Sequence, residues 1–189
     1  MEQGHQTDGH MKPDMMRHHY RMLAVNLLLS LAIMYFAMFA MIWSFGEFVQ
    51  NINFLYMALV MWAPMAIVMM LTMKAMYRNT KVNIVLYAVF TAVFVLSLVG
   101  IRAQGLVGDR QFLRSMIPHH SGALLMCNRS ALRDAEIRDL CFGPDGIVTG
   151  QTREIAQMRA IQDRLSDVVC YEQVMSAVRG IVAADMTCS

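Results

Sequence analysis

A short segment near the middle of the chain carries sulfur and nitrogen donors that could bind one metal ion together. On a helix that turns about 100° per residue, His120 and Cys127 lie within about 40° of Met116. His119 and Met126 lie about 60° to 80° to the other side, so one half of the helix carries all five donors. Thioethers and imidazoles favour soft ions such as Cu(I) and Ag(I), whereas carboxylates suit Mg, Ca and Mn. The segment therefore predicts a site for a soft metal ion.

A second segment, residues 151–158, adds side chains that could complete such a site. Gln151, Glu154 and Met158 fall on one face of a helix. Met158 would supply a further thioether, and Glu154 could orient a histidine ligand by accepting its second ring N–H. A thioether needs no deprotonation and forms no disulfide, so methionine keeps its ligand capacity in an oxidising compartment, unless it is oxidised to the sulfoxide.

The same residue types also have ordinary structural explanations. A methionine on an apolar helix face usually fills the core, and a histidine there is more often a hydrogen-bonded core residue than a ligand. For Cys127, a disulfide with Cys141 would exclude metal binding, whereas a reduced thiolate would be a copper ligand. Four cysteines follow the last apolar run, and this even number suits disulfides in an oxidising compartment, with three possible pairings. They are Cys127, Cys141, Cys170 and Cys188.

Helical periodicity predicts the elements that position the donors. Residues 112–131 and 155–169 repeat apolar or donor side chains at spacings of three and four. We expect Asp109 to be the N-cap of the first helix, and Pro118 marks either a kink or a helix boundary. A turn is expected over 142–146, a short helix over 134–141 and a last helix over 171–183.

Three long apolar runs precede this region. The chain is 57% apolar and 16% charged, against about a quarter charged in an ordinary soluble domain. Residues 22–46, 48–73 and 82–101 contain no Asp, Glu, Lys or Arg, and about 20 apolar residues span a bilayer as a helix. The composition argues against a purely soluble protein. We expect an all-α chain with a disordered His/Met-rich tail (1–21), a three-helix membrane domain (22–104, with helices over 22–46, 53–74 and 82–102) and a helical metal-binding domain (105–189).

The basic residues predict the side of the membrane that each part occupies. Six of them lie in the N-terminal tail and in the second connection, which joins the second and third predicted helices. Three lie in the segment after the third helix, and the first connection, between the first and second helices, carries none. By the positive-inside rule the tail is cytoplasmic and the C-terminal domain lies outside. In a bacterium this predicts an inner-membrane protein with a periplasmic domain. The two groups are Lys12, Arg17, Arg21, Lys74, Arg78 and Lys81, and Arg102, Arg110 and Arg114.

Two other Met-rich regions each allow two explanations. In the second membrane helix, methionines at every fourth position span about 160° of the helix surface. They would form a methionine ladder, a row of thioethers that passes a soft cation through the bilayer, or they would simply pack against neighbouring helices. The lack of a buried charge favours packing. The N-terminal His/Met cluster would be a separate metal site or a solvated tail. The residues are Met57, Met61, Met65, Met69 and Met73 in the helix, and His5, His10, His18 and His19 in the tail.

The two donor segments resemble the signature of a known family. Met116-Ile-Pro-His-His-Ser-Gly-Ala-Leu-Leu-Met126, followed by Gln151-Thr-Arg-Glu-Ile-Ala-Gln-Met158, is similar to the two-part motif of the bacterial domain-of-unknown-function 305 family. The resemblance implies a ferritin-like helical fold and a relation to periplasmic proteins that bind Cu(I) and Ag(I) through Met and His. In the family a continuous helix precedes the second motif, whereas here residues 143–146 interrupt it and could shift the second helix. By position the resemblance implicates Met116, His119, His120, Met126, Glu154 and Met158.

These observations predict a membrane-anchored periplasmic protein that binds Cu(I) or Ag(I) for tolerance, sequestration or delivery. The expected partners are the metal ion, membrane lipid, and further copies of the chain or a metal-efflux protein. Nucleic acid is not expected, because ten basic and ten acidic residues balance from Arg102 onward. No enzyme is expected, since HExxH and GxSxG motifs are absent and a di-iron site would need Glu-x-x-His pairs that the C-terminal domain lacks. The alternatives are a metal transporter that uses the methionine ladder, and a structural membrane partner without a metal role.

Overall fold

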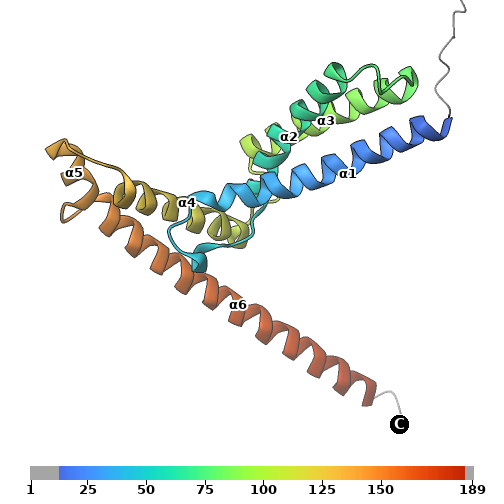
Figure 1. The fold of residues 1–189 in the computed structure, drawn as a ribbon. Coiled ribbons are helices and arrows are strands. Elements are labelled where there is room, and N and C mark those ends of the chain that lie inside the picture. Colours follow the sequence, from blue (N-terminus) through green and yellow to red (C-terminus); the bar gives the residue numbers. More distant parts are fainter. Residues whose placement is uncertain (1–12, 186–189) are drawn as a thin grey trace, which may run out of the picture. The chain divides into compact units, whose positions relative to one another are not determined.

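In the computed structural model, residues 13–185 are described, with side chains for residues 14–167, and every regular element in this part of the chain is a helix (Figure 1). This confirms the all-α class. The elements are α1 (Pro13–Ala37), η1 (Met38–Met41), η2 (Phe45–Glu47), α2 (Ile52–Thr72), α3 (Thr80–Ala103), α4 (Asp109–Arg129), α5 (Ala135–Phe142) and α6 (Ile147–Asp185).

The chain divides into two compact units. The first comprises Met1–Met38 and Asn53–Gly105, and the second comprises Phe39–Ile52 and Leu106–Ser189. The segment 39–52 thus belongs with the C-terminal helices, although residues 22–46 were predicted as one membrane helix. The α-helix ends at Ala37 and the helical span ends with η1 at Met41, so the prediction was wrong beyond Met41. A run without charges does not distinguish a helix from an apolar connection.

Local capping explains why the connection is not helical throughout. Ser44 is the N-cap of the 3-10 helix η2, and its hydroxyl accepts a hydrogen bond from the N–H of Gly46. The side chain of Glu47 accepts from the N–H of Ser44 and completes a capping box. These bonds favour a new short element after Ser44 over a continuation of α1.

The first unit is built from α1, α2 and α3, three helices that are long and apolar enough to cross a membrane. The small side chains of Ala63 and Ala66 allow α2 to approach its neighbours closely. The indole Nε1 of Trp62 donates to the backbone carbonyl of Leu27 at 2.8 Å, which ties α2 to α1. The buried core consists of Leu23, Leu27, Ala63, Ala66, Met70, Tyr77 and Phe90.

The first helix begins earlier than predicted. Residues 13–21, predicted as part of a disordered tail, form the first turns of α1. Proline is favoured in the first turn of a helix, and Asp14 there interacts favourably with the helix dipole. Residues 1–12 of the predicted tail lie outside the described residues. The helices predicted over 53–74 and 82–102 span Ile52–Thr72 and Thr80–Ala103.

The methionine ladder of α2 lies partly on the outside of this unit. Met57, Met61 and Met73 are exposed. The buried face of the same helix is formed by other residues, which are Ala58, Ala63, Ala66 and Met70. Three of the five ladder residues therefore do not line an enclosed passage within the unit.

The second unit is a hairpin of α4 and α6, with α5 between them (Figure 1). A disulfide joins Cys127 of α4 to Cys141 of α5, with their Cα atoms 5.6 Å apart. Pro118 is buried inside α4, so it is not a helix boundary. The core of the hairpin consists of Leu113, Ile117, Leu124, Ile155 and Met158.

Two predicted details of the hairpin were wrong. Gly108 is the N-cap of α4, and Asp109 lies in the first turn, where its charge favours the helix dipole. The separate helices predicted over 155–169 and 171–183 are one helix, α6, because no glycine or proline interrupts residues 151–179. The short predicted helix is confirmed as α5, with Asp134 as its N-cap.

Candidate functional site

Two contacts fix the antiparallel register of α4 against α6. Near one end of the pair, Nη2 of Arg110 donates to the backbone carbonyl of Leu165 at 2.6 Å. Further along α4, Nδ1 of His120 lies 2.9 Å from Oε2 of Glu154. One helical turn before His120 is Met116, and one turn after Glu154 is Met158. The antiparallel register therefore sets Met116 level with Met158.

Met116 and Met158 both belong to the packed interior of the hairpin. Met158 is buried, and Met116 is half-buried against the same apolar cluster. A methionine in this position fills core volume and also carries a polarisable sulfur, one helical turn from the contact of His120 with Glu154. The interruption at 143–146 raised the possibility of a shifted second helix, but the register sets the two donor segments opposite each other.

His120 and Glu154 form the most specific polar contact of the interface. The His120 side chain is 15% exposed and the Glu154 side chain 50% exposed. Nδ1 of His120 is buried and makes no hydrogen bond to another described residue, although Oε2 of Glu154 lies close to it. If Nδ1 carries the ring proton, it can donate this proton to the Glu154 carboxylate. That arrangement would leave Nε2 as the nitrogen for a metal ion.

Three predicted donors are not brought to this interface. The His119 and Met126 side chains are exposed on the surface of α4, with Met126 57% exposed. Met126 lines a cavity of about 250 Å³ beside the disulfide. Cys127 is oxidised in its bond to Cys141 and has no thiolate to offer a metal.

Several predicted residues lie outside the second unit or outside the described residues. His18 and His19 are on the first turns of α1, with their ring centroids 6.4 Å apart. Nδ1 of His19 is buried and has no hydrogen-bond partner among the described residues. The predicted donors His5 and His10, and the side chains of Cys170 and Cys188, lie outside the part of the chain that is described.

A buried carboxylate next to the donor segment was not predicted. Glu47 accepts a hydrogen bond from the hydroxyl of Ser121, and the N–H of Ser44 donates to the same oxygen at 3.0 Å. The Ser121 oxygen in turn accepts from the N–H of Trp43 at 2.6 Å. Ser121 follows His120 directly in the motif, so part of the motif holds the segment 39–52 against α4.

The same segment is held by two arginines. Nη2 of Arg159 lies 3.6 Å from Glu47, and the guanidinium of Arg129 lies 5.6 Å from the ring centre of Trp43. A sequence signal for this arrangement exists, because Glu47 is the single charged residue in the range 22–73. A carboxylate in such apolar surroundings is rarely buried without partners.

The donors of the hairpin suit a soft ion better than a hard one. No group of three or more His, Cys, Asp or Glu side chains converges in the part of the chain that the structure describes. A site at the α4–α6 interface would instead combine two methionine sulfurs with one imidazole nitrogen. This neutral set of donors favours a soft monovalent cation.

Comparison with known proteins gives one family and one relative. Residues 97–162 match the family described as domain of unknown function (DUF305). This range includes all of α4 and α5 and both donor segments. A protein of Acanthamoeba polyphaga mimivirus named "Uncharacterized protein L153" is 31% identical over 120 residues, which cover 64% of this chain and 76% of that protein. No solved structure matches the chain.

Proposed function

The chain belongs to the domain-of-unknown-function 305 family, and from this premise we propose that it is a membrane-anchored binding protein for Cu(I) or Ag(I). It holds the ion for tolerance, sequestration or delivery and does not catalyse a reaction. The observation that carries the proposal is the shared position of Met116, His120 and Met158 at the α4–α6 interface. Glu154, against the ring of His120, orients the nitrogen donor.

The chemistry of these donors fits the compartment that the disulfide indicates. A disulfide such as Cys127–Cys141 persists in an oxidising environment. Methionine remains a ligand there, because it forms no disulfide. Neutral thioether and imidazole ligands add no charge of their own, so only the single charge of the ion enters the half-buried site.

The proposal places α1, α2 and α3 across a bacterial inner membrane, with the hairpin in the periplasm. Their length and composition support this, as do the six basic residues of the tail and the second connection. Three crossings put the segment 39–52 and the hairpin on the same side, and the contact between Trp43 and Ser121 agrees with that. The family resemblance adds a ferritin-like relationship for the hairpin.

Competition for Cu(I) against a chromogenic chelator tests the proposal. The full chain in detergent is required, because a fragment that begins at residue 106 would lack Glu47 and the rest of the segment 39–52. We expect the wild type to take Cu(I) from the chelator and the Met116→Leu/Met158→Leu variant to bind one equivalent less. Leucine has nearly the volume of methionine, so the helical circular dichroism should not change.

The matched control is Met126→Leu, which removes an exposed methionine from the same helix. This variant should bind as much Cu(I) as the wild type. Equal uptake by the control and by the Met116→Leu/Met158→Leu variant would refute the proposed site.

A further inference from the structure

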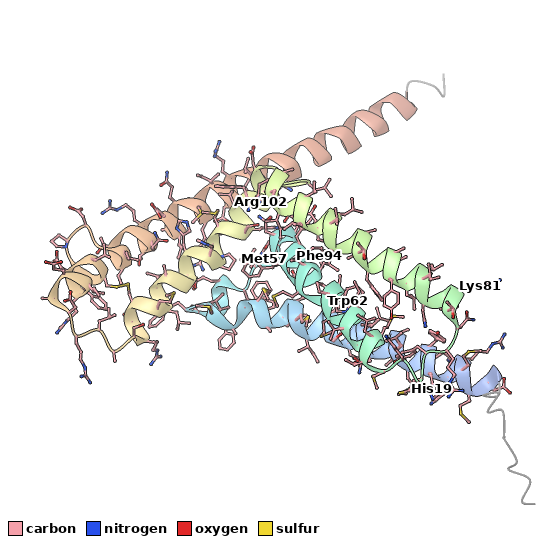
Figure 2. All side chains as sticks on the ribbon, turned by 90° about the horizontal axis from the view of Figure 1, so that it is seen from above. His19, Met57, Trp62, Lys81, Phe94 and Arg102 are labelled. Atoms are coloured by element: carbon pink, nitrogen blue, oxygen red, sulfur yellow. A yellow bond between two sulfur atoms is a disulfide. The ribbon has the colours of Figure 1, made fainter. Side chains whose placement is uncertain are left out.

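A second set of soft donors surrounds a cavity in the first unit. The cavity has a volume of about 280 Å³ and lies where α1 meets the end of α2. His19 and Met22 of α1 are three residues apart and share a face. Met69 of α2, with Met73 and Met76 just after this helix, also lines the cavity. Figure 2 labels His19 on the first part of α1.

One ring nitrogen of His19 is unpaired within the described part of the chain. Its Nδ1 is buried and has no hydrogen-bond partner among the described residues. Buried polar atoms in folded proteins nearly always have a partner, so each exception points to a group that the atom could bind. A metal ion in the cavity would provide that partner, because imidazole Nδ1 is a common metal ligand.

Core packing does not account for all of the methionines. Met69 and Met76 pack against the core of the unit. Met22 and Met73, in contrast, are 55% and 40% exposed and still line the cavity. Leucine would serve an apolar surface equally well, and the sulfur is the property that distinguishes methionine there.

The charge of the cavity also selects the ion. Among the residues that the structure describes, no acidic side chain lines it. Tyr77 lines it as well, and burial raises the pKa of its hydroxyl above the ordinary value, which keeps the side chain neutral. A neutral set of sulfur and nitrogen donors matches a soft monovalent ion and not a hard divalent one.

We propose that these side chains form a second site for Cu(I) or Ag(I). In the orientation of the proposed function, this site is on the cytoplasmic side, where reducing conditions favour Cu(I). It shares no residue with the hairpin site and lies outside the matched range 97–162, so the two sites can fail separately. The donors are His19, Met22, Met69, Met73 and Met76.

Anaerobic Cu(I) titration of the full chain in detergent, against the same chelator, tests the second site. The Met73→Leu/Met76→Leu variant should bind one equivalent less than the wild type, and so should His19→Gln. The matched control, Met34→Leu/Met70→Leu, removes one methionine from α1 and one from α2 that do not line the cavity. This control should keep the wild-type stoichiometry.

Repeating the titration in the Met116→Leu/Met158→Leu background separates the two proposals. If cavity variants lose an equivalent there while the hairpin variant alone loses none, the second site stands and the proposed function fails. If the cavity variants bind as much as the control, the second site is refuted whatever the hairpin does. Circular dichroism and size-exclusion elution identify a misfolded variant, and His19→Gln decides the matter if Met73→Leu/Met76→Leu misfolds.

Discussion

The imidazole of His120 is the donor with the most specific surroundings. Nδ1 faces Glu154, so the orientation of the ring depends on a residue of the other helix. A carboxylate at this position makes the imidazole a better ligand and fixes which nitrogen is available. Glu154 is therefore a positioning residue whose effect is measurable without any change to the donors.

Replacing Glu154 by alanine should weaken Cu(I) binding at the hairpin by about 10- to 100-fold, the range for partners of metal-bound histidines. Glu154→Gln keeps an acceptor oxygen and should lose less. Chelator competition at several free Cu(I) concentrations measures both variants. An alanine variant with unchanged affinity would show that the contact has no part in binding.

Ser121→Ala should destabilise the second unit by about 1–3 kcal/mol, because the buried carboxylate of Glu47 loses a donor and the N–H of Trp43 loses an acceptor. Equilibrium unfolding of the full chain in detergent measures the free energy. Ser166→Ala is the control, since its hydroxyl bonds only within α6 at the surface. Equal stability of the two variants would contradict a structural role for Ser121.

The spacing of donors in the sequence predicted part of the site. Helical periodicity placed Met116 and His120 on one face, and the structure keeps them at the interface with α6. The sequence could not show that His119 and Met126 are exposed while Met116 and His120 are not. Periodicity defines one face of a helix, but it does not show which part of that face a neighbouring helix covers. The pairing of Cys127 depends on where α5 packs, which spacing alone does not give.

At the scale of elements, the sequence predicted helix boundaries best where capping and turn residues are present. Asp134 and the turn at 143–146 define α5 correctly. The segment 39–52 could not be assigned, because Ser121, the hydrogen-bond partner that joins Glu47 to α4, lies 74 residues further along the chain. Contacts at such a sequence separation are set by the packing of the whole unit.

The Cys127–Cys141 disulfide should stabilise the hairpin without taking part in metal binding. The two cysteines are 14 residues apart, and closing a loop of about that length contributes roughly 3 kcal/mol. The Cys127→Ala/Cys141→Ala variant should therefore unfold more easily by about that amount and still bind Cu(I). Loss of Cu(I) binding with unchanged stability would identify a cysteine sulfur as a ligand.

At the scale of the whole molecule, the proposal requires the hairpin and the second connection to lie on opposite sides of the membrane. Phosphatase fusions that are active only in the periplasm test this orientation. A fusion at the C-terminus should be active, and one after Arg78 should be inactive. The reverse pattern would move the hairpin to the cytoplasm and contradict the positive-inside prediction.

Methionine-methyl NMR of the full chain, titrated with Ag(I), reports directly on whether Met116 and Met158 bind one ion. Ag(I) is diamagnetic, and the Met→Leu variants assign each resonance. Both methyl resonances should shift together, in proportion to the bound ion, while that of Met126 stays in place. If Met116 and Met158 remain unshifted when the protein is saturated with Ag(I), the hairpin is not the metal site.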